Sequence, residues 1–297
     1  MTFARHDPTS DPPSLPRMPD WVTSARAETL ADMAFLSGAA LGQLHLAIAN
    51  STVPQPLLRD RLALRAAEAC VAVSGRAERA AELRDAVHFL RPGDLPGPAG
   101  ESYLAWQRAA ERPLSIRALH RALARLAPER IAAWLDAGSA GQGGPVARAA
   151  RVLETVLRDA PRTEASGLIL ADAALAQSLG WEHCLPLLAA GLKRADLRQS
   201  GEALHLACHR AALRSASEAL RLAGDLARRA AHLKAVAPKL RAKGAGAAVE
   251  IFLTRDAVAP GALPLPDRAA RRLCDRLVDL GAVRELTGRD TFRLYGV

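Results

Sequence analysis

The sequence is poor in aromatic residues and in cysteine. Only 4% of its 297 residues are aromatic, and its four cysteines, Cys70, Cys184, Cys208 and Cys274, show no short paired spacing. Strands collect aromatic and β-branched residues, whereas Ala, Leu and Arg dominate here, which argues against a sheet-based fold and predicts a mainly α protein. Isolated cysteines in apolar helical contexts indicate buried, reduced thiols without a disulfide framework, as in a cytoplasmic protein.

The sequence also lacks a recognisable signal peptide or membrane span. Residues 1–20 are rich in proline, without the basic start and apolar middle of a signal peptide, and are expected to form a flexible arm. The most apolar window, residues 30–49, contains Asp32, Gln43 and His45, which is typical of a core helix in a soluble domain. We therefore expect a cytoplasmic protein that makes no membrane contact.

No nucleotide-binding or catalytic motif is recognisable. The glycine-rich loop at residues 138–145 lacks the Lys and the Ser or Thr that end a P-loop, and a helical rather than a strand-like segment precedes it. One candidate metal site consists of His205, Cys208 and His209, which share a face of one helix. Cys208 is equally well explained as a small core residue, so we predict no metal, no other cofactor and no enzymatic activity.

Positive charge is concentrated in the last third of the chain. The formal net charge is +9. Residues 210–297 hold 17 Lys and Arg against 9 Asp and Glu, which leaves 23 and 22 for residues 1–209. A local basic field of this kind attracts a phosphate backbone and predicts salt-dependent binding.

Residues 21–234 predict an irregular bundle of stacked helices with no fixed repeat period. Prolines, glycines and N-cap residues mark the helix ends. The expected helices are 21–50, 54–74, 76–90, 101–111, 115–126, 129–137, one that starts at 145, 163–179, 182–193, and 201–233 with a break near Gly224.

Residues 235–297 predict a small winged-helix-like domain with one β-hairpin. In residues 267–280 apolar and arginine-rich positions occupy opposite faces of a helix, and Gly281 ends it. Two alternating runs, 283–286 and 291–295, then flank the turn-like residues 287–290 and predict the hairpin. A supporting helix is expected at 247–253, but residues 254–266 leave room only for a short turn where a winged fold normally has a second full helix.

The candidate DNA-contacting residues are basic side chains of this domain. They are Arg268, Arg271, Arg272 and Arg276 on the helix, Arg289 and Arg293 on the hairpin, and Lys239, Arg241 and Lys243 on the segment before them. The arginines in the first turns of the helix are expected to read base edges, and those of the hairpin to meet phosphates. Leu273, Leu277, Phe292 and Leu294 are expected to face inward.

Two resemblances extend this interpretation. The tail R-A-A-R-R-L-x-D-R-L-V-x-L-G-A-V-R-E-L-T-G-R-x-T-F-R-L-Y-G resembles the winged-helix C-termini of bacterial regulators and of proteins carried on plasmids and other mobile elements. Over most of its length the chain resembles the bacterial family called domain of unknown function 1403, through RLALRAAEA at 61–69, LRDAVHFLRPGDLPGPAG at 83–100 and APKLRAKGAGAAVE at 237–250. That family name implies no activity.

These observations predict a DNA-binding protein, either a transcriptional regulator or a plasmid or mobile-element maintenance factor. Its partner would be double-stranded DNA, and we expect a homodimer because winged modules usually read half-sites in pairs. The alternative is a helical interaction scaffold whose winged module packs on protein and whose bundle receives a protein partner. Salt-dependent binding to duplex DNA separates the two.

Overall fold

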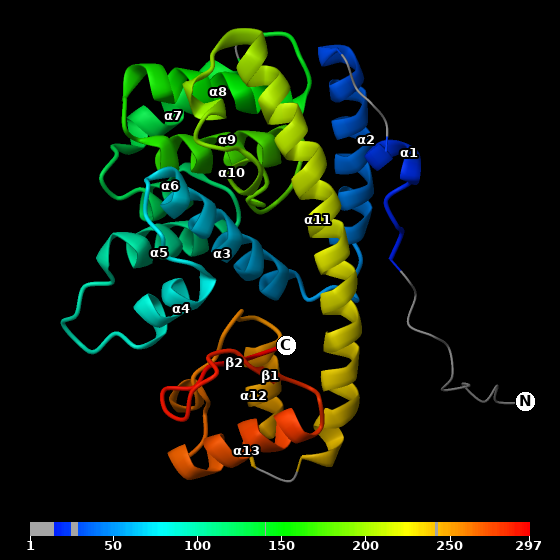
Figure 1. Cartoon of the computed structure of the whole chain (residues 1–297), viewed down its shortest axis with the longest axis vertical. Coiled ribbons are helices and arrows are strands. Elements are labelled where there is room, and N and C mark those ends of the chain that lie inside the picture. The colour runs from blue at the N-terminus through cyan, green and yellow to red at the C-terminus, as the bar shows by residue number, and fades with distance from the viewer. Residues whose placement is uncertain (1–14, 25–28, 140, 241–242) are drawn as a thin grey trace, which may run out of the picture.

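The structure is a computed structural model that describes residues 15–24, 29–139, 141–240 and 243–297, and it is mainly α as predicted. A helical bundle forms the upper part and a smaller C-terminal part lies below it, with one long helix, α11, running beside both (Figure 1). The bundle helices are α1 (Asp20–Ser24), α2 (Leu30–Ile48), α3 (Gln55–Val73), α4 (Ala80–His88), α5 (Gly97–Glu111), α6 (Ile116–Ala122), α7 (Pro128–Ser139), α8 (Pro145–Asp159), α9 (Glu164–Ser178), α10 (Leu188–Gly191) and α11 (Gly201–Val236), with a short 3-10 turn η1 (Asp196–Arg198).

The bundle is organised around three helix pairs, α2 with α11, α8 with α9, and α3 with α5. Helix α9 lies in the centre, since all residues from 167 to 176 are buried. Helix α8 presents one apolar stripe to it, formed by Val146, Ala149, Val152, Leu153 and Val156. A fully buried Leu or Val contributes about 1.5–3 kcal/mol relative to an exposed one, so this pair forms a large part of the core.

Capping residues explain why several helices begin where they do. Thr29 has extended backbone and accepts the amide of Asp32, whose carboxylate accepts the amide of Thr29 in return. Ser115 accepts the amide of Ala118 at 3.1 Å and starts α6. The expectation of one helix over residues 21–50 is therefore wrong, because the extended Thr29 separates α1 from α2.

The segment expected as a helix at 182–193 is mostly irregular, and only α10 is helical. The buried carboxylate of Asp172 on α9 accepts the amides of Leu187 at 3.1 Å, Leu188 at 2.7 Å and Ala189 at 3.2 Å. These amides, which a longer helix would have used internally, are satisfied by a side chain from another helix. Local sequence pattern does not show such a partner, so the prediction failed here.

Helix α11 is continuous over 36 residues, and the expected break near Gly224 does not occur. Gly224 is half-buried and has ordinary helical backbone, and a glycine there costs about 1 kcal/mol relative to Ala without breaking the helix. On another face α11 passes very close to α10, because a Cβ at Gly191 would lie 2.7 Å from the Cα of Ala211. Glycine is therefore required where these helices meet.

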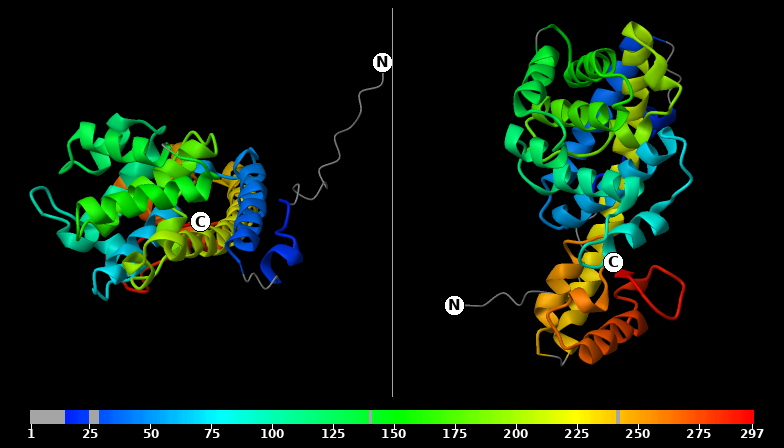
Figure 2. Two further views of the ribbon diagram at one scale, coloured as in Figure 1. Left: turned by 90° about the horizontal axis from the view of Figure 1, so that it is seen from above. Right: turned by 90° about the vertical axis from the view of Figure 1, so that its left-hand side faces the viewer.

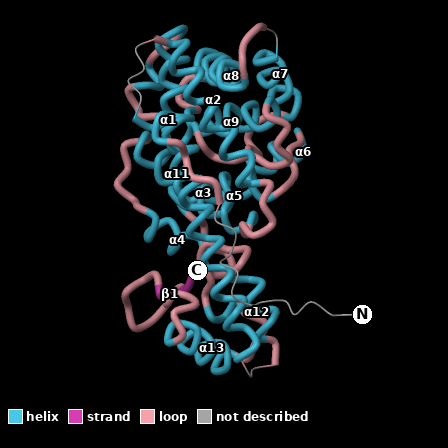
Figure 3. Tube along the Cα trace, turned by 90° about the vertical axis from the view of Figure 1, so that its right-hand side faces the viewer, coloured by secondary structure: helices cyan, strands magenta, loops and turns pink. Residues whose placement is uncertain are grey.

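The C-terminal part contains η2 (Ala237–Lys239), α12 (Ala245–Phe252), η3 (Pro260–Ala262), α13 (Asp267–Asp279) and the strands β1 (Arg284–Glu285) and β2 (Tyr295–Gly296). The strands pair antiparallel, Arg284 with Gly296 and Glu285 with Tyr295, and are shorter than expected. Within the described residues, β1 and β2 form a two-stranded sheet, and the rest of the C-terminal part consists of helices and loops (Figure 3). A 3-10 turn replaces the second full helix, as the sequence indicated.

Residues 1–14 of the proline-rich arm lie outside the described residues, while Leu15 and Met18 pack against the core. Helix α2 is long and apolar enough to pass a length and composition test for a membrane span, and 39% of that window is buried inside the protein.

Candidate nucleic-acid interface

Helix α13 separates an apolar face from an arginine-rich one, as the sequence predicted, and the exposed face also carries Asp275 and Asp279. Its buried side chains are those of Ala270, Leu273, Cys274 and Leu277. Its exposed basic side chains are those of Arg268, Arg271, Arg272 and Arg276. The helix lies at the bottom of the C-terminal part, away from the bundle (Figures 1 and 2).

The arginines of α13 are largely free of ion pairs. Arg271 pairs with Asp267 at 2.8 Å, and both side chains are more than 60% exposed, so this pair contributes little to stability. Arg268, Arg272 and Arg276 form no ion pair with any described residue. Their guanidinium groups are available to an external anion.

Basic residues of the preceding segment lie in the same part of the molecule. Lys239 is exposed at the end of η2, and Lys243 is exposed beside Gly244, while Arg241 lies outside the described residues. Gly244 has φ of +96°, and its Cα faces the carbonyl of Pro264 so closely that a Cβ would lie 3.2 Å from it. Since residue 264 lies just before α13, the fold brings Lys243 toward the amino end of that helix.

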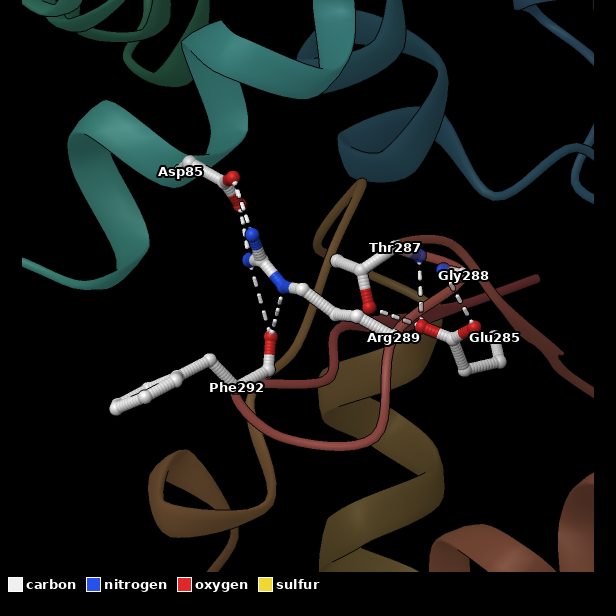
Figure 4. A network of polar contacts seen from close by, with 6 residues as sticks. All are labelled: Asp85, Glu285, Thr287, Gly288, Arg289 and Phe292. Carbon is white, nitrogen blue, oxygen red and sulfur yellow. Dashed lines mark hydrogen bonds and ion pairs between the residues drawn. The ribbon is translucent and has the colours of Figure 1, made fainter.

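The hairpin loop is held by the carboxylate of Glu285. It accepts the amides of Thr287 at 2.7 Å and Gly288 at 2.8 Å, and also the Thr287 hydroxyl (Figure 4). Partial burial opposes ionisation, but these hydrogen bonds outweigh it and hold the pKa of Glu285 below its ordinary value. The loop is therefore built to present Arg289 in a fixed direction.

Arg289 points at the bundle. Its Nη1 and Nη2 donate to the two carboxylate oxygens of Asp85 on α4, at 2.8 and 2.6 Å, and its Nε and Nη2 donate to the carbonyl of Phe292 at 3.2 and 3.1 Å (Figure 4). Arg293 donates to the carbonyl of Arg289 at 2.9 Å and lies 3.5 Å from Asp290. The two hairpin arginines proposed from the sequence to meet DNA are thus engaged within the protein.

Aromatic rings reinforce this contact. The guanidinium of Arg289 lies 5.1 Å from the ring centre of Phe89, and the Phe89 and Phe292 rings meet edge to face at 5.6 Å. Phe292 has φ of +54° and is 67% exposed, so the expectation that it faces inward is wrong. Leu273, Leu277 and Leu294 are buried as expected.

A second contact fixes the C-terminal part on the bundle, and sequence reasoning did not find it. Asp256 is fully buried and forms ion pairs with Arg61 of α3 and with Arg84 of α4, whose Nε lies 2.6 Å from the carboxylate. Burial alone would lower the pKa of Arg84, but its hydrogen bond to Asp256 and the charge of that residue raise it. The partners lie more than 170 positions apart, so no local signal marks them.

Neighbouring polar groups extend this buried cluster. The carboxylate of Asp60 accepts the amide of Asp256 at 2.8 Å and the side-chain amide of Gln107 at 2.8 Å. Burial raises the pKa of Asp60 despite these hydrogen bonds. Arg61 also donates to the carbonyl of Val297 at 3.4 Å, so Asp256 and the last residue of the chain meet the same helix.

Comparison with known families identifies the chain. The family model described as "Protein of unknown function (DUF1403)" matches residues 6–297. The chain belongs to this family. No curated protein matches this DUF1403 sequence. Because the family description names no activity, functional inference for a DUF1403 chain rests on its residues.

The metal candidates of this DUF1403 chain lie on α11, where Cys208 and His209 are buried and His205 is half-buried. The Nδ1 of His209 lies 2.7 Å from the hydroxyl of Ser37, and burial lowers the pKa of His209 to about 4. Cys208 is buried, and burial raises its pKa to about 12. Within the described residues no group of three or more His, Cys, Asp and Glu side chains could hold a metal ion.

Proposed function

We propose that this protein binds double-stranded DNA through the outward face of α13. The observation that carries the proposal is the set of arginines on that face that have no carboxylate partner. Guanidinium groups form paired hydrogen bonds with phosphates and with guanine edges, and a B-DNA major groove is wide enough to admit a helix. The excess of positive charge in residues 210–297 supports the same partner.

Within this proposal the basic residues have different roles. Arg268, Arg271 and Arg272 occupy the first turns of α13 and would read base edges. Arg276, Lys239 and Lys243 would contact phosphates and position the protein. Arg289 would reach DNA only by leaving Asp85, so its contribution depends on a change in the hairpin contact.

We also propose that two copies associate through α2. Trp21, Phe35 and Leu46 are 52%, 67% and 58% exposed, and the rings of Trp21 and Phe35 stack at 5.6 Å. On the same helix Gly38 and Gly42 have open space where a Cβ would stand, which permits close approach of another helix. A homodimer with two α13 helices would read paired half-sites in DNA.

A helical scaffold without DNA binding is the second candidate. The hairpin tip already packs on protein, through Arg289 and Phe292 on α4, which is the behaviour expected of a winged module used for protein contact. In that case the partner protein would occupy the bundle surface, and α13 would contribute only solubility.

The test uses the full-length chain with two substitutions on α13, Arg268→Gln and Arg272→Gln. The parent protein should bind unrelated duplex DNA, and the four arginine contacts of α13 should contribute about −4 to its log-log salt slope. On unrelated duplex, where the matching base edges are absent, Arg268 and Arg272 would contact phosphates, so the double variant should lose roughly two units of that slope and bind less tightly. A matched control is Arg125→Gln with Arg158→Gln, two exposed arginines that already pair with Glu101 and Asp159.

Equal binding by the α13 variant and the control variant would reject α13 as the interface. Absence of duplex binding by the parent chain at low salt would reject DNA binding and favour the scaffold. Circular dichroism of each variant checks that the helical fold is retained.

A further inference from the structure

A second group of arginines lies on the bundle, where helices α5 and α6 meet. Arg108 and Arg112 belong to the end of α5, and Arg117 and Arg121 belong to α6. All four side chains are exposed. This corner is held in place by the amide of Leu114, which donates to the carbonyl of Glu182 at 2.7 Å, and by the bridge between Pro113 and His183.

These four arginines form no ion pair with any described residue. Some other exposed arginines of the bundle, such as Arg79, Arg125 and Arg158, each pair with a carboxylate. Residues 1–209 are nearly neutral as a whole, with 23 basic and 22 acidic residues. Four unpaired arginines at one corner, with Glu111 as the acidic residue in the lining of its crevices, therefore concentrate positive charge, and like charges so placed repel until an anion neutralises them.

The corner is hollowed by two adjacent crevices. One, of about 560 Å³, is lined by Arg108, Glu111, Arg112, His120, Arg121 and Ala124. The other, of about 320 Å³, is lined by Arg112, Pro113, Ser115, Arg117, Ala118 and Arg121. Because Arg112 and Arg121 line both, the two crevices form a continuous basic surface with room for more than one anionic group.

The lining side chains indicate the chemical class of the anion. Guanidinium groups pair with phosphate in two-pronged geometry, and arginine is the only basic residue besides His120. Neither lining contains Phe, Tyr or Trp, on which unpaired bases would stack. The surface therefore suits the phosphates of a duplex, whose bases are stacked within the helix, better than a single strand.

Packed helices also connect the α5–α6 corner to the proposed DNA-binding part. Helix α5 packs against both α6 and α4, and α4 carries Asp85, the partner of the hairpin residue Arg289. In Figure 1 α5, α6, α4 and the hairpin loop all lie toward the left-hand side, with α4 between the other two groups. Packing of α5 on α4 therefore links the corner to the hairpin contact.

We propose that the α5–α6 corner is a second binding site for the phosphate backbone of duplex DNA, a role that rests on the proposed function. The site contributes affinity and no base discrimination, since it offers charge without a groove-reading element. Arg112 and Arg121 are its central residues because they line both crevices.

The experiment compares full-length variants by fluorescence anisotropy on a random 30-base-pair duplex at several salt concentrations. Arg112→Gln with Arg121→Gln should lower the log-log salt slope by roughly two units and weaken binding equally for any duplex sequence. The pair Arg108→Gln and Arg117→Gln tests the same surface independently, should the first variant fail to fold. Arg125→Gln with Arg158→Gln should leave the slope unchanged.

The outcomes separate this inference from the α13 proposal. If both corner variants keep the salt slope of the parent protein, the corner site is wrong and the α13 proposal is unaffected. A reduced slope in the corner variants together with normal binding by Arg268→Gln/Arg272→Gln supports the corner and rejects α13. If the parent chain binds no duplex, both proposals are wrong.

Discussion

Asp85 of α4 and Arg289 of the hairpin, 204 positions apart in the sequence, share two hydrogen bonds of 2.8 and 2.6 Å. Both side chains are more than one third exposed. Such a pair contributes about 0.2–1 kcal/mol, which is small compared with the attraction of a phosphate backbone for a freed arginine. The contact is therefore strong enough to orient the hairpin and weak enough to be exchanged.

Asp85→Asn should release Arg289 and strengthen DNA binding. The gain corresponds to the lost ion pair, about 1.4- to five-fold in affinity, and the salt slope should steepen by close to one unit. Asp290→Asn is the matched control, because it removes one negative charge from the hairpin itself. Asp290 is fully exposed and its carboxylate lies 3.5 Å from Arg293, whereas Arg289 pairs with Asp85. Anisotropy titrations in which Asp85→Asn and Asp290→Asn behave alike would show that Arg289 does not contact DNA.

Asp256→Asn should destabilise the whole protein. The substitution leaves the guanidinium groups of Arg61 and Arg84 without their buried counter-charge, and breaking one side of a buried ion pair costs about 3–5 kcal/mol. Urea denaturation followed by circular dichroism measures the loss. Asp290→Asn should change stability by less than about 0.5 kcal/mol, and a similarly small effect of Asp256→Asn would mean that the buried pairs do not hold the two parts together.

Two buried groups should give opposite pH dependences of stability. Burial raises the pKa of Asp172 to about 7, so its stabilising protonated form is lost as pH rises from about 4 to 7. Burial lowers the pKa of His209 to about 4, so its stabilising neutral form is lost as pH falls from about 6.5 to 4. In the parent protein these contributions offset each other.

A variant that lacks one of these groups should therefore show the pH dependence of stability caused by the other. Between pH 7 and 4.5, Asp172→Asn should lose stability on acidification relative to the parent, and His209→Gln should gain it, each by up to about 1.4 kcal/mol per pH unit. Denaturant titrations at several pH values measure both slopes. Identical pH profiles for the two variants would contradict the opposite protonation states assigned to Asp172 and His209.

Phe35→Ser with Leu46→Ser should convert a dimer into a monomer of 31.5 kDa. These side chains form the exposed apolar face of α2 proposed to meet a second copy. Leu95→Ser serves as control, since Leu95 is 85% exposed in a loop. Light scattering that finds only a monomer in the parent protein at micromolar concentration would refute association through α2.

Sequence reasoning found the elements whose signals are local. These local signals are the prolines at the start of α3 and α8, the N-cap Ser115 and the two-faced pattern of α13. Each signal acts within a few residues, and those helices lie close to where they were expected. The basic face of α13 was predicted for the same reason. Periodicity alone identifies which side of an isolated helix is polar.

The failures concern groups whose partners are distant in sequence. The amides at the start of α10 are satisfied by Asp172, and the hairpin tip turns toward the bundle because it contacts Asp85 of α4 and Phe89 just after that helix. Phe292, placed inside by strand alternation, is exposed because the loop leaves the strands after Leu286. The Asp256 cluster was missed altogether, since Arg61 and Arg84 resemble ordinary surface arginines of amphipathic helices.

The unbroken α11 has a consequence for how the length of the chain can vary. It packs on α2 near one end and reaches α13 near the other, where the Nε2 of His232 lies 3.0 Å from the carbonyl of Leu280. One residue added between these levels would turn the far end by about 100° and shift it by about 1.5 Å. Asp256 would then no longer meet Arg84, and Arg289 would no longer meet Asp85. We therefore expect insertions to be tolerated in loops such as residues 91–96 but not within α11, whose length sets the rotation of the C-terminal part relative to the bundle.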